Sequence, residues 1–146
     1  MKGRGNSLLS SAMLDSSPHA HRRLVEDKIA WLTTVRSDGQ PQTSAVWFLL
    51  EGDEVLVYSQ PGVPKVENIA ANPRVALNLD GNGRGGDIVT IEGRADVVED
   101  HPVAFEVPAY LDKYAGYIEH EGWTPESFSA DYSVAIRIEP TRLRAW

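Results

Sequence analysis

Apolar and polar residues alternate in several short stretches of the chain, as they do in β-strands that bury one face. The clearest stretch is 74–79, where Val75, Leu77 and Leu79 share one face of the predicted strand. Similar β-rich stretches bring the number of predicted strands to six. They cover residues 31–35, 43–50, 54–58, 74–79, 88–98 and 133–138.

Short turns connect the first three of these stretches. Residues 37–40 (SDGQ) form the first turn and Gly52-Asp53 the second. Connections this short predict a meander of three antiparallel strands joined as hairpins. Gly93 lies inside the longest stretch and predicts a β-bulge or bend there. The glycine-rich residues 81–87 (GNGRGGD) lack the spacing of a nucleotide-binding loop and predict a further turn.

Helices are predicted in three places. The first starts at residues 15–18, where a serine hydroxyl or the Asp15 carboxylate can cap the helix and Pro18 fits its first turn. A short helix covers 65–71 and ends before Pro73, because proline disfavours helical geometry in the residue before it. The third covers 101–120, whose apolar residues recur at helical spacing, and Pro108 is expected to kink or split it.

These elements predict a mainly β domain with flanking helices. Six short strands cannot bury their faces as an open sheet, so we expect them to close into a small antiparallel barrel with helices on its outside. No repeat or linker divides the chain. Residues 1–14 are mostly small and polar and are expected to form a flexible arm, followed by a single domain over 15–146.

Composition narrows the class of protein. Of the 146 residues, 42% are hydrophobic and 24% charged, which is ordinary globular composition. No apolar run approaches the ~20 residues that span a bilayer, and the net charge of −7 opposes binding to nucleic acid. The absence of cysteine excludes disulfides and thiolate chemistry. The first residues lack the continuous apolar segment of a secretion signal, so a cytoplasmic protein is expected.

The order of these motifs resembles the split β-barrel flavin-binding superfamily of pyridoxamine 5'-phosphate oxidase, and within it the branch that uses the deazaflavin coenzyme F420. The resemblance covers most of residues 25–146. Its four pieces are AWLTTVRSDGQPQTSAVWF, LVYSQPGVPKVENIAANPRVALNL, IEGRADVV and IRIEPTRLRAW. The second piece is the most specific, because a strand end, a lysine, a short helix and Asn-Pro follow in a fixed order. The resemblance implies a six-stranded antiparallel FMN-binding split β-barrel that acts as a homodimer.

Lys65 stands at the start of a predicted helix directly after a strand. A helix N-terminus offers free backbone N–H groups and a partial positive charge, which suit a phosphate. On residue types alone, a solvated lysine is the commoner explanation. In the family that the chain resembles, this segment holds the cofactor phosphate. The resemblance therefore makes Ser59, Gln60, Lys65 and Asn68 candidate cofactor-binding residues.

Residues 44–47 are expected to line the flat cofactor ring. Such a ring needs an apolar wall and backbone hydrogen-bonding groups along its edge. Trp47 is large enough to form the wall, although it fits the barrel core equally well. The resemblance implies backbone contacts for Ala45 and Val46, and Ser44 completes the candidate segment.

The C-terminal tail places Arg142, Arg144 and Trp146 in alternation, so that they can share one face of an extended segment. By itself this is an ordinary polar terminus with an aromatic anchor. The resemblance implies cofactor sites between two subunits, with an aromatic and basic C-terminal end near the ring. Arg142 and Trp146 are therefore candidate cofactor contacts, with Trp146 reaching the ring from its own or the other subunit.

No catalytic residue is identified from the sequence. The four histidines lack metal-ligand spacing, so no metal site is expected, and no serine stands in a nucleophile motif. A deazaflavin enzyme needs no protein nucleophile, since the cofactor delivers the hydride and the protein orients the substrate. Tyr110, Tyr114 and an ordered water are open alternatives for a proton donor.

The leading hypothesis is an F420-dependent reductase that transfers a hydride between the deazaflavin ring and an unsaturated or quinone-like small molecule. Two alternatives stay open: an FMN-binding oxidoreductase of the same fold, and a non-catalytic barrel that carries a flavin, deazaflavin or haem. Neither nucleic acid nor a membrane is an expected partner. Vitamin B6 oxidation is not expected, because the chain lacks most of the substrate-phosphate arginines of pyridoxamine phosphate oxidase in recognisable form.

Overall fold

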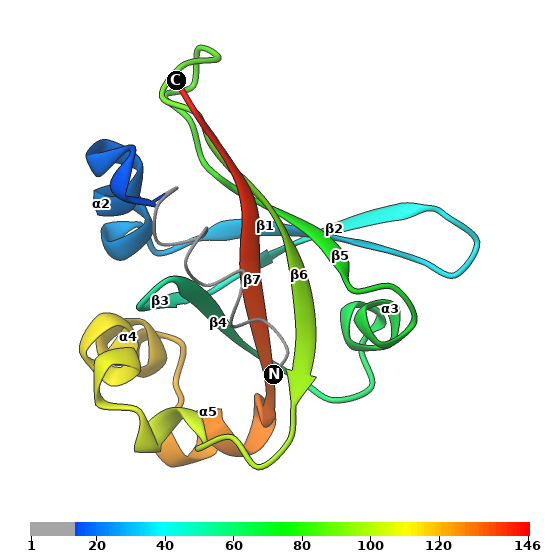
Figure 1. Ribbon diagram of the computed structural model, residues 1–146. Coiled ribbons are helices and arrows are strands. Elements are labelled where there is room, and N and C mark those ends of the chain that lie inside the picture. Colours follow the sequence, from blue (N-terminus) through cyan, green and yellow to red (C-terminus); the bar gives the residue numbers. More distant parts are fainter. Residues whose placement is uncertain (1–13) are drawn as a thin grey trace.

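The computed structural model describes residues 14–146 and shows a curled antiparallel sheet with helices around it (Figure 1). This confirms the expected fold class of a mainly β barrel with flanking helices. The expected N-terminal arm lies outside the described residues except for Leu14, which is buried in the main core.

The described residues form seven strands, one more than the sequence predicts. Every pairing between them is antiparallel, and the order across the sheet is β2-β1-β5-β6-β7-β4-β3. The strands are β1 (Ala30–Val35), β2 (Pro41–Val46), β3 (Leu49–Glu51), β4 (Glu54–Ser59), β5 (Arg74–Leu79), β6 (Val89–Val98) and β7 (Val134–Ala145).

The additional strand arises because the predicted strand 43–50 is broken. β2 ends at Val46 and β3 begins at Leu49, with Trp47 and Phe48 between them. β2 pairs with β1 and β3 pairs with β4, so the predicted three-strand meander is wrong in its middle. β2 and β3 lie at opposite edges of the sheet, and the two residues between them connect those edges. This short connection requires the sheet to curl into a barrel.

Two turns and a bulge agree with the sequence prediction. Gly39 and Gly52, with φ of 90° and 63°, lie in the turns of the β1–β2 and β3–β4 hairpins. The register of β6 against β7 shifts between Glu92 and Gly93. A Cβ atom at Gly93 would lie 2.7 Å from the carbonyl oxygen of Glu139, so the bulge depends on glycine.

The α-helices α2 to α5 each begin with a proline, whose fixed φ and missing N–H suit the first turn. The helices are α2 (Pro18–Glu26), α3 (Pro64–Ala71), α4 (Pro108–His120) and α5 (Pro125–Asp131). The Ser17 hydroxyl caps α2 by accepting from the Ala20 N–H at 3.3 Å. The helix predicted over 101–120 is split at Pro108, one of the two expected effects of this proline: Pro108 starts α4, and the preceding turn is a 3₁₀ helix, η1 (Ala104–Glu106).

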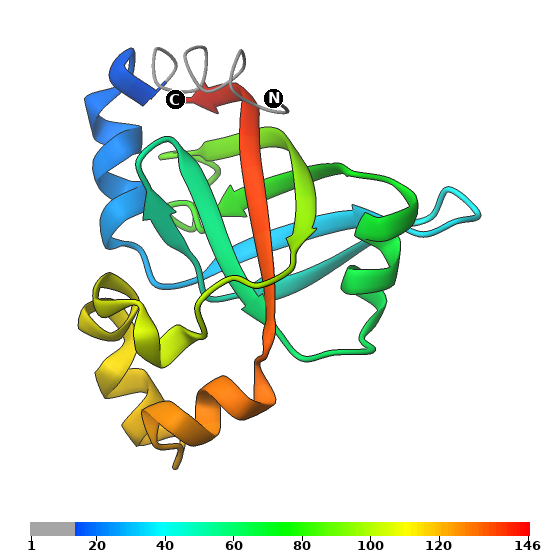
Figure 2. The ribbon, with the colours of Figure 1, turned by 60° about the horizontal axis from the view of Figure 1, so that its bottom comes forward.

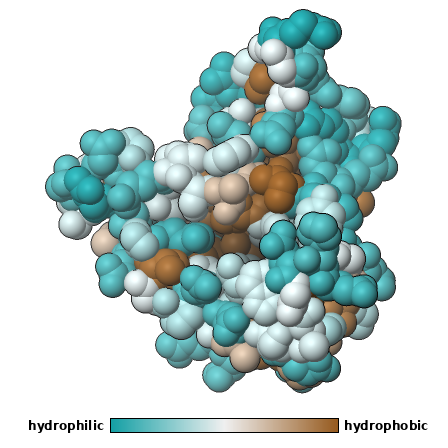
Figure 3. Space-filling model, turned by 180° about the vertical axis from the view of Figure 1, so that it is seen from behind, coloured by the Kyte–Doolittle hydropathy of each residue, from teal (hydrophilic) through white to brown (hydrophobic). Residues whose placement is uncertain are grey.

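Two hydrophobic clusters pack against the strands. The main cluster includes Leu32, Leu77 and Ile136 and forms the barrel core. A second, aromatic cluster includes Tyr114 and Phe128 and lies where α4 and α5 pack beside β3 and β4. Figure 2 shows α4 and α5 together on one side and α3 on the other. Seen from behind, the surface is hollowed near its middle, where apolar residues gather (Figure 3).

Candidate functional site

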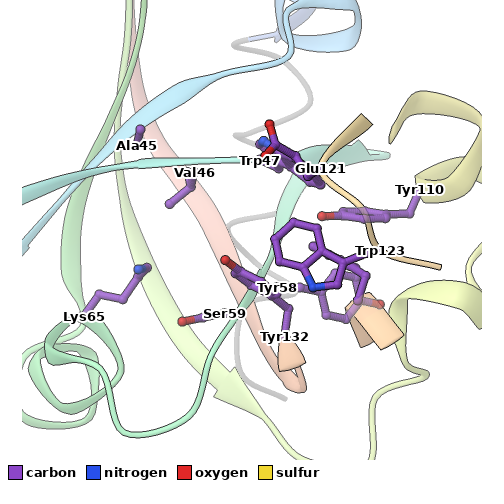
Figure 4. A pocket seen from close by; sticks show the side chains of 11 residues that line it. Ala45, Val46, Trp47, Tyr58, Ser59, Lys65, Tyr110, Glu121, Trp123 and Tyr132 are labelled. Atoms are coloured by element: carbon purple, nitrogen blue, oxygen red, sulfur yellow. The ribbon is translucent and has the colours of Figure 1, made fainter. Parts of the chain in front are cut away.

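A cavity of about 210 Å³ lies where the ends of β2 and β4, the start of α3 and the α4–α5 region meet (Figure 4). Its wall is mostly apolar and aromatic, with a few polar groups, which is the usual character of a small-molecule site. The lining residues are Ala45, Val46, Trp47, Tyr58, Ser59, Lys65, Tyr110, Glu121, Trp123, Phe128 and Tyr132.

Half of the predicted cofactor-binding residues line this cavity, from two separate stretches of chain. Ala45, Val46 and Trp47 come from the end of β2, whereas Ser59 and Lys65 come from the end of β4 and the helix after it. β2 and β4 are far apart in the strand order and meet here because the sheet curls. The fold thus assembles the predicted ring-binding and phosphate-binding segments into one cavity.

Trp47 packs in the aromatic cluster, not in the barrel core, and also lines the cavity. Its ring stacks on Tyr114, with centroids 5.0 Å apart and planes at 5°, and on Phe128 at 5.3 Å and 17°. It is half-buried there. Trp47 therefore connects the packing of α4 and α5 to the wall of the site.

Lys65 is the second residue of α3 and is half-buried at the cavity. No carboxylate within residues 14–146 forms an ion pair with it. Burial lowers the pKa of Lys65, because the cation has lost part of its hydration. A partly desolvated amine without a carboxylate partner, beside the free N–H groups of a helix start, is suited to an anionic ligand.

Ser59 is the last residue of β4, and Gln60 follows it. The Ser59 side chain is buried, and its hydroxyl donates to the Gln60 carbonyl oxygen at 2.9 Å. Gln60 itself is exposed and does not line the cavity. The chain then turns at Gly62, with φ of 72°, and enters α3.

Asn68 lies outside this cavity. Its amide donates to Thr34 Oγ1 at 3.0 Å and to Gln42 Oε1 at 2.9 Å, which ties α3 to β1 and β2. Asn68 lines a second cavity of about 270 Å³ on another side of α3. In the structure it positions the helix that carries Lys65.

Ser44, Arg142 and Trp146 also lie outside the cavity. Ser44 is half-buried in β2, opposite Leu32 of β1. Ser59 pairs with Val134 at the start of β7. Arg142 is eight residues further along that strand, roughly 25 Å at ~3.3 Å per residue, and Trp146 is beyond it. Neither can reach the cavity of its own chain.

A sequence model described as pyridoxamine 5'-phosphate oxidase matches residues 17–146. The chain belongs to this family. The match spans both stretches that form the cavity and the whole α4–α5 region. A search of curated proteins found no match.

Solved structures agree with the family assignment. A protein described as an F420 reductase is 30% identical, with 84% of this chain and 94% of that chain covered and a TM-score of 0.67. An FAD-binding protein from Mesorhizobium loti is 23% identical over 86% of this chain and 88% of its own, with a TM-score of 0.61. The haem-storage protein HutZ from Vibrio cholerae is 18% identical over 90% and 92%, with a TM-score of 0.60. The last two show the shared fold.

In this member of the family, sequence reasoning missed one wall of the cavity. The wall comes from Glu121, Trp123, Phe128 and Tyr132, together with Tyr110, which the sequence singled out only as an alternative proton donor. Seven of the chain's 12 aromatic residues lie within residues 101–132. This concentration of aromatic residues could have indicated a shared aromatic surface. Because α5 was not predicted, the sequence did not show that these residues come together.

The Tyr114 hydroxyl holds the corner between β2 and β3. It accepts from the Phe48 N–H at 2.8 Å, and it can donate to the carbonyl oxygen of Lys28 at 2.7 Å or of Phe48 at 2.9 Å. Lys113 Nζ donates to the same Phe48 carbonyl at 2.8 Å and lies 3.8 Å from the centre of the Phe48 ring. α4 therefore fixes the backbone beside Trp47.

Lys113 is expected to make stability depend on pH. Burial, and then the nearby Lys28, lower the pKa of Lys113 from 10.5 to about 8. The unfolded chain therefore binds more protons than the folded protein between these values, and folding becomes more favourable as pH rises through them. We expect the free energy of unfolding of the wild type, relative to Lys113→Met, to increase from about pH 8 to about pH 10 in urea titrations. Parallel profiles of the two proteins would contradict this.

Two further features concern membranes and metals. No helix among residues 14–146 is long and apolar enough to cross a membrane. Within the same part of the chain, no three or more His, Asp or Glu side chains are grouped so that they could hold a metal ion.

Proposed function

We propose that this protein is an F420-dependent reductase that transfers a hydride between the deazaflavin ring and an unsaturated or quinone-like small molecule. The observation that carries the proposal is Lys65, a half-buried amine without a carboxylate partner among the described residues, at a helix start that borders an aromatic cavity. The 30% identical structure described as an F420 reductase supports the choice of cofactor.

The residues of the cavity suit such a cofactor. Lys65 and the first N–H groups of α3 would hold its phosphate, and residues 45–47 would form the wall and backbone edge for its ring. When bound, the reduced deazaflavin supplies the hydride. The protein's own part is to orient the two reactants and to exclude water with the aromatic wall.

The second subunit of a homodimer would explain the C-terminal residues. Arg142 is exposed on β7 and Trp146 is 64% exposed, and both lie far from the cavity of their own chain. The Arg144 guanidinium lies 5.2 Å from the centre of the Trp146 ring. In the proposed homodimer, which acts in the cytoplasm on a small-molecule substrate, this basic and aromatic end would contact the cofactor held by the partner.

An FMN-binding oxidoreductase is the competing function, because Lys65 would meet the phosphate of FMN equally well. Parallel titrations of the purified protein with F420 and FMN, followed by cofactor fluorescence, separate the two. We expect saturable F420 binding with a dissociation constant of about 1 μM or below, with much weaker FMN binding. Tighter FMN binding would move the protein to the flavin enzymes. Binding of neither would overturn both assignments.

A further inference from the structure

The hydroxyls of three buried tyrosines in the aromatic cluster differ in their partners. The Tyr114 hydroxyl bonds to backbone groups of Phe48 and Lys28, and the Tyr58 hydroxyl donates to the Pro102 carbonyl at 2.8 Å. The Tyr110 hydroxyl is buried and has no hydrogen-bond partner within the described part of the chain. Tyr110 is 0% exposed, so bulk water does not satisfy it.

An unpartnered buried hydroxyl destabilises the folded protein, and phenylalanine would fill the same space without that penalty. Tyr110 nevertheless contributes to the wall of the cavity. Figure 4 shows it pointing from α4 into that space. Burial also raises the pKa of Tyr110, so the group keeps its proton and remains a donor.

The shape and charge of this wall restrict what the hydroxyl can meet. Trp47 and Phe128 are stacked within 17° of each other, and Trp123 meets Trp47 edge-on at 88°. Because these rings stack on each other, it is the apolar, aromatic character of the wall, and not a slot between the rings, that favours a flat aromatic ligand. The Glu121 carboxylate lines the same cavity, which disfavours an anionic ligand on this side.

We propose that Tyr110 is a specificity-determining residue that donates a hydrogen bond to a neutral carbonyl oxygen of a planar aromatic substrate, such as a quinone. The inference rests on the proposed function, because it names the substrate class of the same site. Lys65 and the end of β2 would hold the cofactor, and the α4–α5 wall would hold the substrate.

Ligand binding to the cofactor-free protein tests this without relying on activity. The probes are menadione, which is 2-methyl-1,4-naphthoquinone, and 2-methylnaphthalene, which has the same two rings and no oxygen. Isothermal titration calorimetry measures both affinities in the wild type and in Tyr110→Phe. We expect the substitution to weaken menadione binding about tenfold, the effect of one neutral hydrogen bond, and to leave binding of 2-methylnaphthalene unchanged.

Two further variants serve as matched controls. Tyr58→Phe removes a hydroxyl that is already bonded to Pro102, and Tyr132→Phe removes the hydroxyl of another tyrosine that lines the cavity. Neither should lower menadione binding selectively. A urea unfolding midpoint of Tyr110→Phe at or above that of the wild type is expected, because the lost hydroxyl has no partner among residues 14–146.

Several results would overturn the proposal. The first is that the wild type does not bind menadione. The second is that Tyr110→Phe binds menadione with unchanged affinity, or loses affinity for menadione and 2-methylnaphthalene equally. The third is that Tyr132→Phe loses affinity for menadione but not for 2-methylnaphthalene. The proposed cofactor is tested separately by the F420 titration of the wild type. Failure of that titration would remove the reductase assignment while the difference between the two probes could still be measured.

Discussion

Replacement of Lys65 by alanine is expected to weaken F420 binding by about 10- to 100-fold. A charge-assisted hydrogen bond contributes about 1.5–3 kcal/mol, and tenfold in affinity corresponds to about 1.4 kcal/mol. Little stability should be lost, because Lys65 forms no ion pair within residues 14–146 and burial already lowers the pKa of its amine. F420 fluorescence titrations and urea unfolding of the same variant measure the two effects.

Two controls separate a direct phosphate contact from lost packing and from long-range charge attraction. Lys65→Met keeps most of the apolar stem and removes only the charge, so it should lose as much affinity as Lys65→Ala. Arg84→Ala removes one positive charge from the exposed loop before β6, and the last residue of that loop, Ile88, exchanges backbone hydrogen bonds with Trp146 beyond the far end of β7. It should leave F420 affinity nearly unchanged. If Arg84→Ala and Lys65→Ala lost the same F420 affinity, Lys65 would act only through long-range charge attraction and not through a direct contact with the phosphate.

Tyr114→Phe is expected to lower the free energy of unfolding by about 2–3 kcal/mol, because it leaves the buried N–H of Phe48 without its acceptor. Removing the partner of a buried donor and leaving that donor unsatisfied costs about 1–3 kcal/mol. The Phe48 carbonyl keeps its bond from Lys113. Urea unfolding should show a lower midpoint with an unchanged slope.

Tyr110→Phe is the matched comparison for this prediction. Tyr110 lies one helical turn before Tyr114 in α4, is equally buried, and differs in having a hydroxyl without a partner in the described chain. Its replacement should leave the unfolding midpoint unchanged or raise it. If both variants lose the same stability, the Tyr114 bonds at the β2–β3 corner contribute nothing specific.

The corner also couples stability to the site. Trp47 stacks on Tyr114 and is adjacent to Phe48, so a corner that shifts in Tyr114→Phe displaces one wall of the cavity. F420 affinity should therefore fall together with stability in this variant. In Lys65→Ala, affinity should fall alone. This difference distinguishes Lys65, which is proposed to contact the ligand, from Tyr114, which stabilises the wall of the cavity.

Local patterns in the sequence were sufficient for most elements. The alternation of Val75, Leu77 and Leu79 predicted a strand correctly, because period-two burial depends only on neighbouring residues. Gly39 and Gly52 marked real turns, and Gly93 marked a real bulge, because each reflects a backbone requirement at one position.

Pro108 was expected to kink or split a helix, and the sequence left the two outcomes open because proline both breaks and begins helices. Its fixed φ and missing N–H are unfavourable inside a helix and harmless in the first turn. Which effect applies depends on whether a helix precedes it, and here a 3₁₀ turn does. The spacing of apolar residues over 101–120 was compatible with both arrangements.

The sequence by itself determined the mainly β class, the family resemblance, and the local order in which Lys65 follows a strand and starts a helix. Only the tertiary structure decided that the edges of the sheet meet at Trp47 and Phe48, that Asn68 ties α3 to β1 and β2, and that α4 and α5 supply the aromatic wall. The physical reason is the separation along the chain of the residues that interact. Strand period, turns and caps depend on residues a few positions apart, whereas sheet closure and cavity walls depend on contacts between segments separated by tens of residues.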